Sequence, residues 1–362
     1  MPTTDQLLQA LAAVIDPNTG KGFVASKAIK NLKIDGTAVT FELELAYPAK
    51  SQHAEFEQAL TAVASAIEGV GSVSVTTSTQ VASHSVQRGV QLLPGVKNII
   101  AVASGKGGVG KSTTAVNLAL ALAAEGASVG LLDADIYGPS IPMMMGIAGK
   151  PESVDGKSMM PMLGHGLQVM SIGFLVEPDQ AMIWRGPMAT QALDQLLRQT
   201  AWEDLDYLIV DMPPGTGDIQ LTLSQRVPLT GAVIVTTPQD IALLDAKKGI
   251  KMFEKVGVPI LGIVENMAVH VCANCGHIEH IFGEDGGKKM AVSYQMDYLG
   301  GLPLDMQIRL QADGGTPTVV ADPQGTVAGL YKAIARKLAV SVAAKAKDFS
   351  SKFPSITISK DT

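Results

Sequence analysis

The segment "SGKGGVGKST" at residues 104–113 has the composition of a loop that binds phosphate. Gly105, Gly110, Lys111 and Ser112 fit the pattern G-x-x-x-x-G-K-[ST], in which backbone N–H groups point at phosphate oxygens. Lys111 is predicted to reach the β- and γ-phosphates, and the Ser112 hydroxyl is predicted to bind Mg²⁺. The segment follows the apolar run "NIIAVAS" and opens a helical pattern, which is the context such a loop requires. The sequence therefore predicts a nucleotide site.

Aspartates that end other apolar runs are candidates for holding the metal and for catalysis. Asp211 ends "LDYLIVD", in the position of the acidic residue that supports Mg²⁺ in nucleotide sites of this kind. Asp133 and Asp135 end "LLDAD". We expect Asp135 to orient the attacking water and Asp133 to support the metal with Asp211 and Ser112, although Asp133 also suits a helix cap.

The glycine-containing stretch after Asp211 is predicted to move as a switch loop when the γ-phosphate comes and goes. Its members are Pro214, Gly215, Thr216, Gly217 and Asp218.

A second lysine, Lys106, follows the first glycine of the phosphate loop. With it, "GKGGVGKST" resembles the deviant Walker A motif of the MinD, ParA and nitrogenase iron protein class of P-loop ATPases. The resemblance implies that Lys106 reaches across a homodimer interface to the partner's nucleotide. A cation supplied in trans would stabilise charge at the β–γ bridge, as an arginine finger does. The loop residues expected to contact ATP are Gly105, Lys106, Gly107, Gly108, Val109, Gly110, Lys111, Ser112 and Thr113.

Cys272 and Cys275 are the only cysteines of the chain and form a C-x-x-C pair, so a disulfide framework is excluded. Two thiolates are half of a metal site, and three completions are open. His277 and His280 would complete a zinc site, but almost no loop separates the ligand pairs. The two thiols could instead form a redox couple, but the cysteines of such a couple are expected at a helix N-terminus, and this placement is lacking here. Two chains would together supply the four thiolates of a [4Fe–4S] cluster, and this completion is favoured because Lys106 also implies a dimer.

Six segments taken together resemble the Mrp/ApbC family of iron–sulfur cluster carriers. They are "GKGGVGKST", "DADIYGPS", "WRGPM", "DMPPGTGD", "VENM" and "CANCGH". The resemblance implies an ATP- and Mg²⁺-dependent hydrolase whose dimer holds a [4Fe–4S] cluster between paired C-x-x-C motifs and passes it to apoproteins, with scaffold proteins as further partners. It assigns Lys106, Lys111, Ser112, Asp135 and Asp211 to the ATPase. It also implies that Asn266 contacts adenine and that Pro303 lines the same pocket.

Short Val- and Ile-rich runs alternate with helical stretches from residue 98 onward, which predicts an α/β domain over residues 97–348. We expect a mainly parallel sheet with helices on both faces and ligands at the carboxyl ends of the strands. Residues 81–96 are predicted to be a linker, and residues 349–362 a mobile tail.

The N-terminal residues 1–80 are expected to form a small α+β domain in the order helix, hairpin, helix, strand. The helices are predicted over residues 3–14 and 54–67, with a hairpin turn at Asp35 and Gly36. This unit resembles the small domain of SufT-type iron–sulfur assembly factors. Its segment "AYPAKSQHAEF" has no cysteine, which argues against cluster binding by this domain alone.

The bulk composition limits the classes of function. A formal net charge of −6 argues against a protein whose main function is to bind nucleic acid. We find no apolar run near eighteen residues and no signal-peptide pattern, so a cytoplasmic protein without stable membrane association is expected. The rival hypotheses are a MinD/ParA-like switch without a cluster, a zinc-bridged ATPase, and a reductase like the nitrogenase iron protein.

Overall fold

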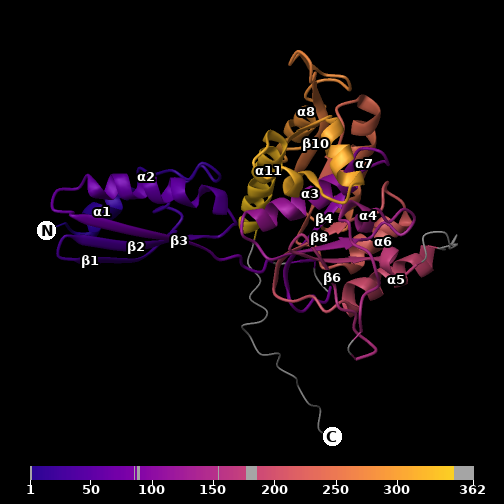
Figure 1. The fold of residues 1–362 in the computed structure, drawn as a ribbon, viewed down its shortest axis with the longest axis horizontal. Helices are drawn as coiled ribbons and strands as arrows, with labels where there is room; N and C mark the ends of the chain where they lie inside the picture. Colours follow the sequence, from indigo (N-terminus) through magenta and orange to yellow (C-terminus); the bar gives the residue numbers. More distant parts are fainter. Residues whose placement is uncertain (1, 85, 88–89, 154, 177–185, 346–362) are drawn as a thin grey trace, which may run out of the picture.

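The computed structural model describes residues 2–84, 86–87, 90–153, 155–176 and 186–345. Within them the chain forms a small three-stranded sheet near the N-terminus and a nine-stranded sheet in the remainder. Figure 1 shows the N-terminal unit projecting sideways from the larger body. Trp184 and Arg185 of the "WRGPM" segment lie outside the described residues, as does the predicted tail.

The N-terminal unit has the predicted order of elements, which are α1 (Thr4–Leu11), β1 (Ile29–Asp35), β2 (Ala38–Leu45), α2 (His53–Ser65) and β3 (Ser72–Thr79). Thr3 and Gln6 form a capping box that starts α1. Asp35 pairs with Ala38 across the hairpin, and Gly36 takes the left-handed conformation (φ 60°) that this tight turn requires. Strands β1 and β2 pair antiparallel, and β2 and β3 pair parallel. Helix α1 packs against β1, and α2 packs against β3.

The large sheet has the strand order β11-β10-β9-β4-β8-β5-β7-β6, with β12 also paired to β10. Its central ladders are parallel, and among the described strands of this sheet only the β10–β11 and β6–β7 pairs are antiparallel. The strands are β4 (Val96–Ala103), β5 (Val129–Asp133), β6 (Met162–Gly164), β7 (Leu167–Ser171), β8 (Leu205–Asp211), β9 (Gly231–Thr236), β10 (Ile260–Val271), β11 (Ile278–Glu279) and β12 (Tyr298–Pro303). The predicted α/β class with a mainly parallel sheet is confirmed.

Helices cover both faces of this sheet because the crossovers run in opposite directions along it. The β4–α3–β5 connection moves one way, whereas β8–α6–β9 and β9–α7–β10 move the other way, so right-handed crossovers put α3 on one face and α6 and α7 on the other. The helices are α3 (Lys111–Ala124), α4 (Ile141–Met144), α5 (Gly186–Gln199), α6 (Asp218–Arg226), α7 (Asp240–Lys255), α8 (Gly286–Ser293), α9 (Met306–Asp313), α10 (Thr318–Ala321) and α11 (Thr326–Ala343).

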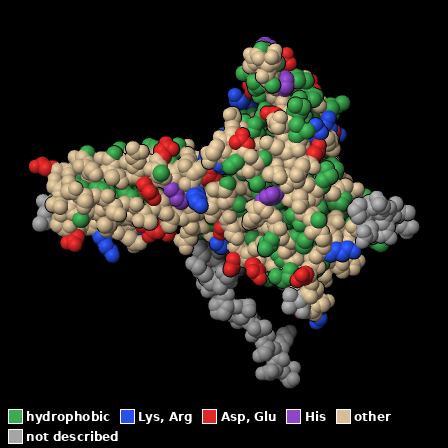
Figure 2. Space-filling model, viewed as in Figure 1, with side chains coloured by type: hydrophobic (Ala, Val, Ile, Leu, Met, Phe, Trp, Pro, Cys, Tyr) green, Lys and Arg blue, Asp and Glu red, His purple; other side chains and the backbone are tan. Residues whose placement is uncertain are grey.

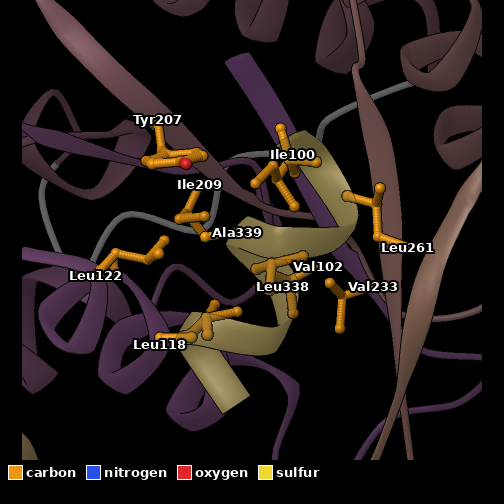
Figure 3. Packing of buried hydrophobic residues seen from close by; sticks show 14 of the residues in the cluster. Ile100, Val102, Leu118, Leu122, Tyr207, Ile209, Val233, Leu261, Leu338 and Ala339 are labelled. Carbon is orange, nitrogen blue, oxygen red and sulfur yellow. The ribbon is translucent and has the colours of Figure 1, made fainter. Parts of the chain in front are cut away.

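The core is aliphatic and lies between the sheet and its helices. Figure 3 shows Leu118 and Leu122 of α3, with Leu338 of α11, among side chains of the central strands. Burying these side chains is the main source of stability for such a layer. The core therefore holds α3, and with it the phosphate loop, against the sheet.

The N-terminal unit meets the larger body at the C-terminal end of α3. Glu125 is buried there and accepts hydrogen bonds from the backbone N–H and the hydroxyl of Ser51. Arg336 of α11 donates to the same carboxylate at 2.6 Å. Three segments far apart in the sequence thus meet at one buried carboxylate.

Strand β10 is longer than the sequence suggested, since it continues past "VENM" to Val271, directly before the first cysteine. The apolar run predicts only the buried first half of the strand, whereas pairing with β11 and β12 extends the second half. No helix within the described residues is long and apolar enough to span a membrane.

Candidate functional site

The phosphate loop joins β4 to α3 and owes its shape to its glycines. Gly108 and Gly110 have φ values of 81° and 79°, which is the left-handed region that side chains disfavour. Gly105 lies so close to the backbone of Asp245 in α7 that a side-chain carbon would overlap it. The loop opens α3 at Lys111, so its N–H groups and the positive end of the helix dipole face the same space.

Lys111 is buried and makes the shortest ion pair of the site, with its Nζ 2.6 Å from Asp211 Oδ1. The same ammonium lies 3.2 Å from Ser112 Oγ and 3.9 Å from Asp135 Oδ2. The structure thus brings together four of the predicted site residues. Burial raises the pKa of Asp135 and of Asp211, and the Lys111 ammonium opposes both shifts.

The second carboxylate oxygen of Asp211 fits a metal site. Asp211 is fully buried, and its Oδ2 has no hydrogen-bond partner among the described residues. An unpaired buried carboxylate oxygen is costly unless a proton, water or cation satisfies it. Ser112 lies beside it on the first turn of α3, so a hydroxyl and a carboxylate, both ligands suited to Mg²⁺, are side by side.

Asp133 has a different environment from the other two aspartates. It is fully buried, and its carboxylate accepts hydrogen bonds from Ser171 Oγ at 2.9 Å and from the backbone N–H groups of Asp135 and Ile141. Burial, followed by the charge of Asp211, raises the pKa of Asp133 to about 7, although the Ser171 hydrogen bond opposes the shift. These contacts suit a residue that holds the loop after β5, while metal ligation by Asp133 stays a prediction.

A cavity of about 250 Å³ lies over the loop. It is lined by Ser104, Lys106, Gly107, Gly108, Gly110, Lys111, Ser112, Thr113, Asp135, Ser140, Met144 and Pro214. Lys106 is half-buried at this wall, and its side chain makes no ion pair with any residue that the structure describes. One lysine of the loop is therefore paired within the chain, and the other is available to a ligand.

The predicted switch loop touches the phosphate loop directly. The N–H of Gly215 donates to the carbonyl of Ser104 at 3.0 Å, and Pro214 lines the cavity. Asp218 starts α6, so a movement of the loop would be passed to that helix. Ser104 also donates its hydroxyl to the carbonyl of Lys106. The motif pattern starts one residue later and therefore did not single out Ser104.

Asn266 and Pro303 lie in different places. The side-chain amide of Asn266 donates to the carbonyl of Val109 at 2.9 Å, and it packs where a side chain on Gly110 would lie. Asn266 thus holds the phosphate loop from behind. Pro303 lines a separate cavity of about 200 Å³ beside Val269. Adenine contact by either residue stays a prediction.

The two cysteines occupy the tip of a hairpin formed by β10 and β11. The N–H of Cys272 donates to the carbonyl of His277 at 2.9 Å, and the N–H of Gly276 donates to the carbonyl of Cys272 at 2.8 Å. Cys275 is exposed. Hydrogen bonds from the N–H groups of Asn274 and Cys275 lower the pKa of the Cys272 thiol, which favours the thiolate that binds metals.

The hairpin tip projects from the body with apolar side chains around the thiols. Val271, Ile278 and Ile281 are each about half exposed. On the face drawn in Figure 2, the upper projection carries hydrophobic and histidine side chains. Such a cluster of exposed apolar groups is typical of a contact surface.

The histidines downstream do not complete a metal site in the described part of the chain. No three His, Cys, Asp or Glu side chains among the described residues come close enough to hold an ion. His280 instead hydrogen-bonds the carbonyl of Ala268 through Nδ1 at 3.1 Å, and His277 is exposed. This geometry weighs against a zinc ion held within one chain.

Two protein families match this chain. Residues 95–339 match a family described as NUBPL iron-transfer P-loop NTPases. Residues 4–75 match a family described as iron–sulfur cluster assembly proteins.

Similar proteins carry related names. The iron–sulfur cluster carrier protein of Haemophilus influenzae is 49% identical over 339 residues, covering 93% of this chain and 92% of its own. The Escherichia coli K12 protein of the same name is 64% identical over 249 residues, covering 68% of both chains. The mouse iron–sulfur cluster transfer protein NUBPL is 56% identical over 248 residues, covering 68% of this chain and 78% of its own.

Solved structures show the same fold in the larger body. A nucleotide-binding protein from Archaeoglobus fulgidus in complex with ADP has a TM-score of 0.56 and 39% identity, covering 64% of this chain and 90% of that one. The Pyrococcus furiosus cell division ATPase MinD has a TM-score of 0.51 at 22% identity, covering 67% and 98%.

Proposed function

We propose that this chain, which belongs to the NUBPL iron-transfer P-loop NTPase family, is an ATP-dependent carrier of iron–sulfur clusters. Two copies would hold one [4Fe–4S] cluster between their paired cysteines and transfer it to apoproteins. The predicted family, a P-loop NTPase of the cluster-carrier type with an N-terminal assembly-factor domain, is confirmed.

The observation that carries the proposal is the C-x-x-C pair at the hairpin tip, where Cys272 is half-buried and Cys275 is exposed. Cys272 and Cys275 are the only thiols of the chain, and the described residues offer no further ligand beside them. An iron–sulfur cluster of the cubane type needs four thiolates. A second copy of the hairpin supplies the missing two, and the apolar side chains around the tip would be covered in the same step.

The phosphate loop would bind ATP through its backbone N–H groups, Lys111 and Thr113. Lys111 must then exchange its contact with Asp211 for the phosphates. Asp135 lines the same cavity and would orient the attacking water. Lys106 would act on the partner's nucleotide, which makes hydrolysis depend on the dimer.

Ser112 and Asp211 would hold Mg²⁺, which when bound neutralises negative charge on the phosphates. The partnerless Oδ2 of Asp211 supports this assignment. We infer that hydrolysis times the loading or the release of the cluster, because the switch loop contacts the phosphate loop through Gly215.

Anaerobic reconstitution with iron and sulfide tests the carrier function. We expect iron and sulfide in a ratio of about four to each pair of chains, together with a thiolate-to-iron charge-transfer band. Cys275→Ala should abolish the band without changing ATP binding, because the hairpin tip is not part of the nucleotide cavity. His277→Ala is the matched control and should keep the cluster.

The rival functions give other results. One zinc ion per chain and no iron would identify a zinc-bridged ATPase. Protein that turns over ATP but binds neither metal would identify a switch like MinD or ParA. Incubation of the loaded dimer with an apoprotein that needs a [4Fe–4S] cluster separates a carrier from an electron-transfer protein, since only a carrier loses its cluster to the acceptor.

A further inference from the structure

Strand β10 contacts the phosphate loop of the nucleotide cavity and leads directly into the cysteine hairpin. Asn266 in its middle holds the phosphate loop through the carbonyl of Val109, and Cys272 follows its last residue. Glu265, next to Asn266, accepts a hydrogen bond from the N–H of Gly287 and so holds the start of α8. One strand therefore connects the nucleotide cavity with the cysteine hairpin.

The residue between these two parts of β10 has an unusual backbone. Met267 has a φ of 57°, in the left-handed region. Among the described non-glycine residues, only Met267 and Asn31 combine a positive φ with a place inside a strand. Asparagine tolerates this conformation well, whereas a long apolar side chain does not. The position of Met267 is thus held by its surroundings.

The pairing of β10 also breaks at this residue. Glu265 pairs with Gly301 of β12, and the next pair joins Val269 to Pro303. Between these pairs, three residues of β10 therefore face one residue of β12, which is a bulge centred on Met267. Bulges bend a strand and redirect the side chains beyond them.

The part of β10 beyond the bulge is one unit with the cysteine hairpin. The carbonyl of Ala268 accepts a hydrogen bond from His280 on the returning limb, and His270 and Val271 pair with Glu279 and Ile278. A rotation at Met267 would therefore move Cys272 and the returning limb together, and it would also shift the hydrogen bond that the carbonyl of Val269 accepts from the N–H of Leu304 at 2.7 Å. The residue before the bulge, Asn266, is fixed to the phosphate loop.

We propose that Met267 is the joint through which the phosphate loop positions the cysteine hairpin, so that nucleotide occupancy changes the accessibility of Cys272 and Cys275. This inference rests on the proposed function and names its coupling residue. Met267 touches no reacting group and acts as a positioning residue. Relaxation of this strained backbone would give the joint a second conformation, and the contact at Val109 would select between the two.

The test measures alkylation of the reduced, metal-free full chain by a maleimide. Every label marks the C-x-x-C pair, because the chain has no other cysteine. We expect a non-hydrolysable MgATP analogue to change the wild-type rate by about fivefold or more, at the lower end of common coupling between two sites. Met267→Asn, which keeps the left-handed preference, should retain this effect.

Met267→Val should lose the effect while binding the nucleotide normally, since a β-branched side chain excludes the left-handed backbone. If Met267→Val does not fold, Met267→Thr serves, because threonine is also β-branched and its hydroxyl suits this half-buried position. A wild-type alkylation rate that does not change with the nucleotide, or a Val or Thr variant that keeps the full effect, would overturn the proposal. The assay needs no cluster, so its outcome is independent of the reconstitution that tests the carrier function.

Discussion

At the residue scale, the two lysines of the phosphate loop have separate environments. Lys111 is buried against Asp211, at 2.6 Å, and is part of its own chain's site. Lys106 lies at the cavity wall without an ion pair among the described residues. A lysine that makes no ion pair with the described residues of its own chain suits a cation that acts in trans.

Replacing Lys106 by alanine should stop ATP turnover. A cation supplied in trans to a transferring phosphoryl group contributes about 10³-fold or more to the rate. Nucleotide binding should persist because Lys111 and the loop N–H groups remain. Phosphate release and nucleotide titration measure the two effects, and Lys248→Ala, at an exposed ion pair, is the control. Full turnover by Lys106→Ala would remove the trans role.

Asp133 should make stability depend on pH. Its folded pKa of about 7 lies above that of an unfolded aspartate, near 4, so the native protein binds the proton more tightly between these values. The free energy of unfolding contributed by this group therefore falls as pH rises through that window. Asp133→Asn removes the contribution.

Urea unfolding of both proteins from pH 4 to pH 7 measures the effect of Asp133. The free energy of unfolding of the variant, relative to that of the wild type, should rise by about 3 kcal/mol across this window. Ser171, which donates to the carboxylate, can also donate to an amide oxygen, so the variant keeps that bond. A difference independent of pH would show that Asp133 is ionised throughout.

At the scale of elements, α7 sets the position of the phosphate loop. Its backbone at Asp245 occupies the space where a side chain of Gly105 would lie, whereas nothing lies within 4 Å of the corresponding position at Gly107. The first glycine of the motif is therefore needed for packing between a loop and a helix distant in sequence.

Gly105→Ala should lower the free energy of unfolding by about 1 to 3 kcal/mol, since the added methyl forces the loop and α7 apart. It should also weaken nucleotide binding because the loop moves. Gly107→Ala is the matched control, with a small effect on thermal unfolding. Equal melting temperatures for the two variants would contradict the close approach at Asp245.

At the scale of the whole molecule, the N-terminal unit is held by a buried charge. Glu125 joins the end of α3 to Ser51 and to Arg336. Because α3 begins at the phosphate loop, its two ends contact the nucleotide cavity and the N-terminal unit.

Arg336→Met should destabilise the joint by about 3 kcal/mol, because it leaves the Glu125 carboxylate buried without its cation. We expect faster proteolysis within residues 81–96, measured by timed digestion and mass spectrometry. Arg309→Met removes an exposed ion pair with Asp313 and should change neither stability nor digestion measurably. Unchanged digestion of Arg336→Met would show that other contacts hold the unit.

Residue types and their spacing are enough to predict the elements whose geometry is local. The phosphate loop, its following helix and the C-x-x-C pair are contiguous motifs, so spacing and residue type suffice to predict them. The alternation of apolar runs and helices likewise predicts a parallel sheet, because each buried strand and amphipathic helix carries its own periodicity. Residues such as Asp211, which end those runs, follow from the same pattern.

Contacts between residues far apart in the sequence became known from the three-dimensional structure alone. Asn266 contacts Val109 rather than a residue near it in sequence, Glu125 pairs with Arg336, and Asp133 lies buried against Ser171. The backbone of Met267 is equally invisible to periodicity, because β12 and the hairpin impose it. Contacts of this kind depend on how strands and helices pack in three dimensions, and a single sequence carries no local signal for them.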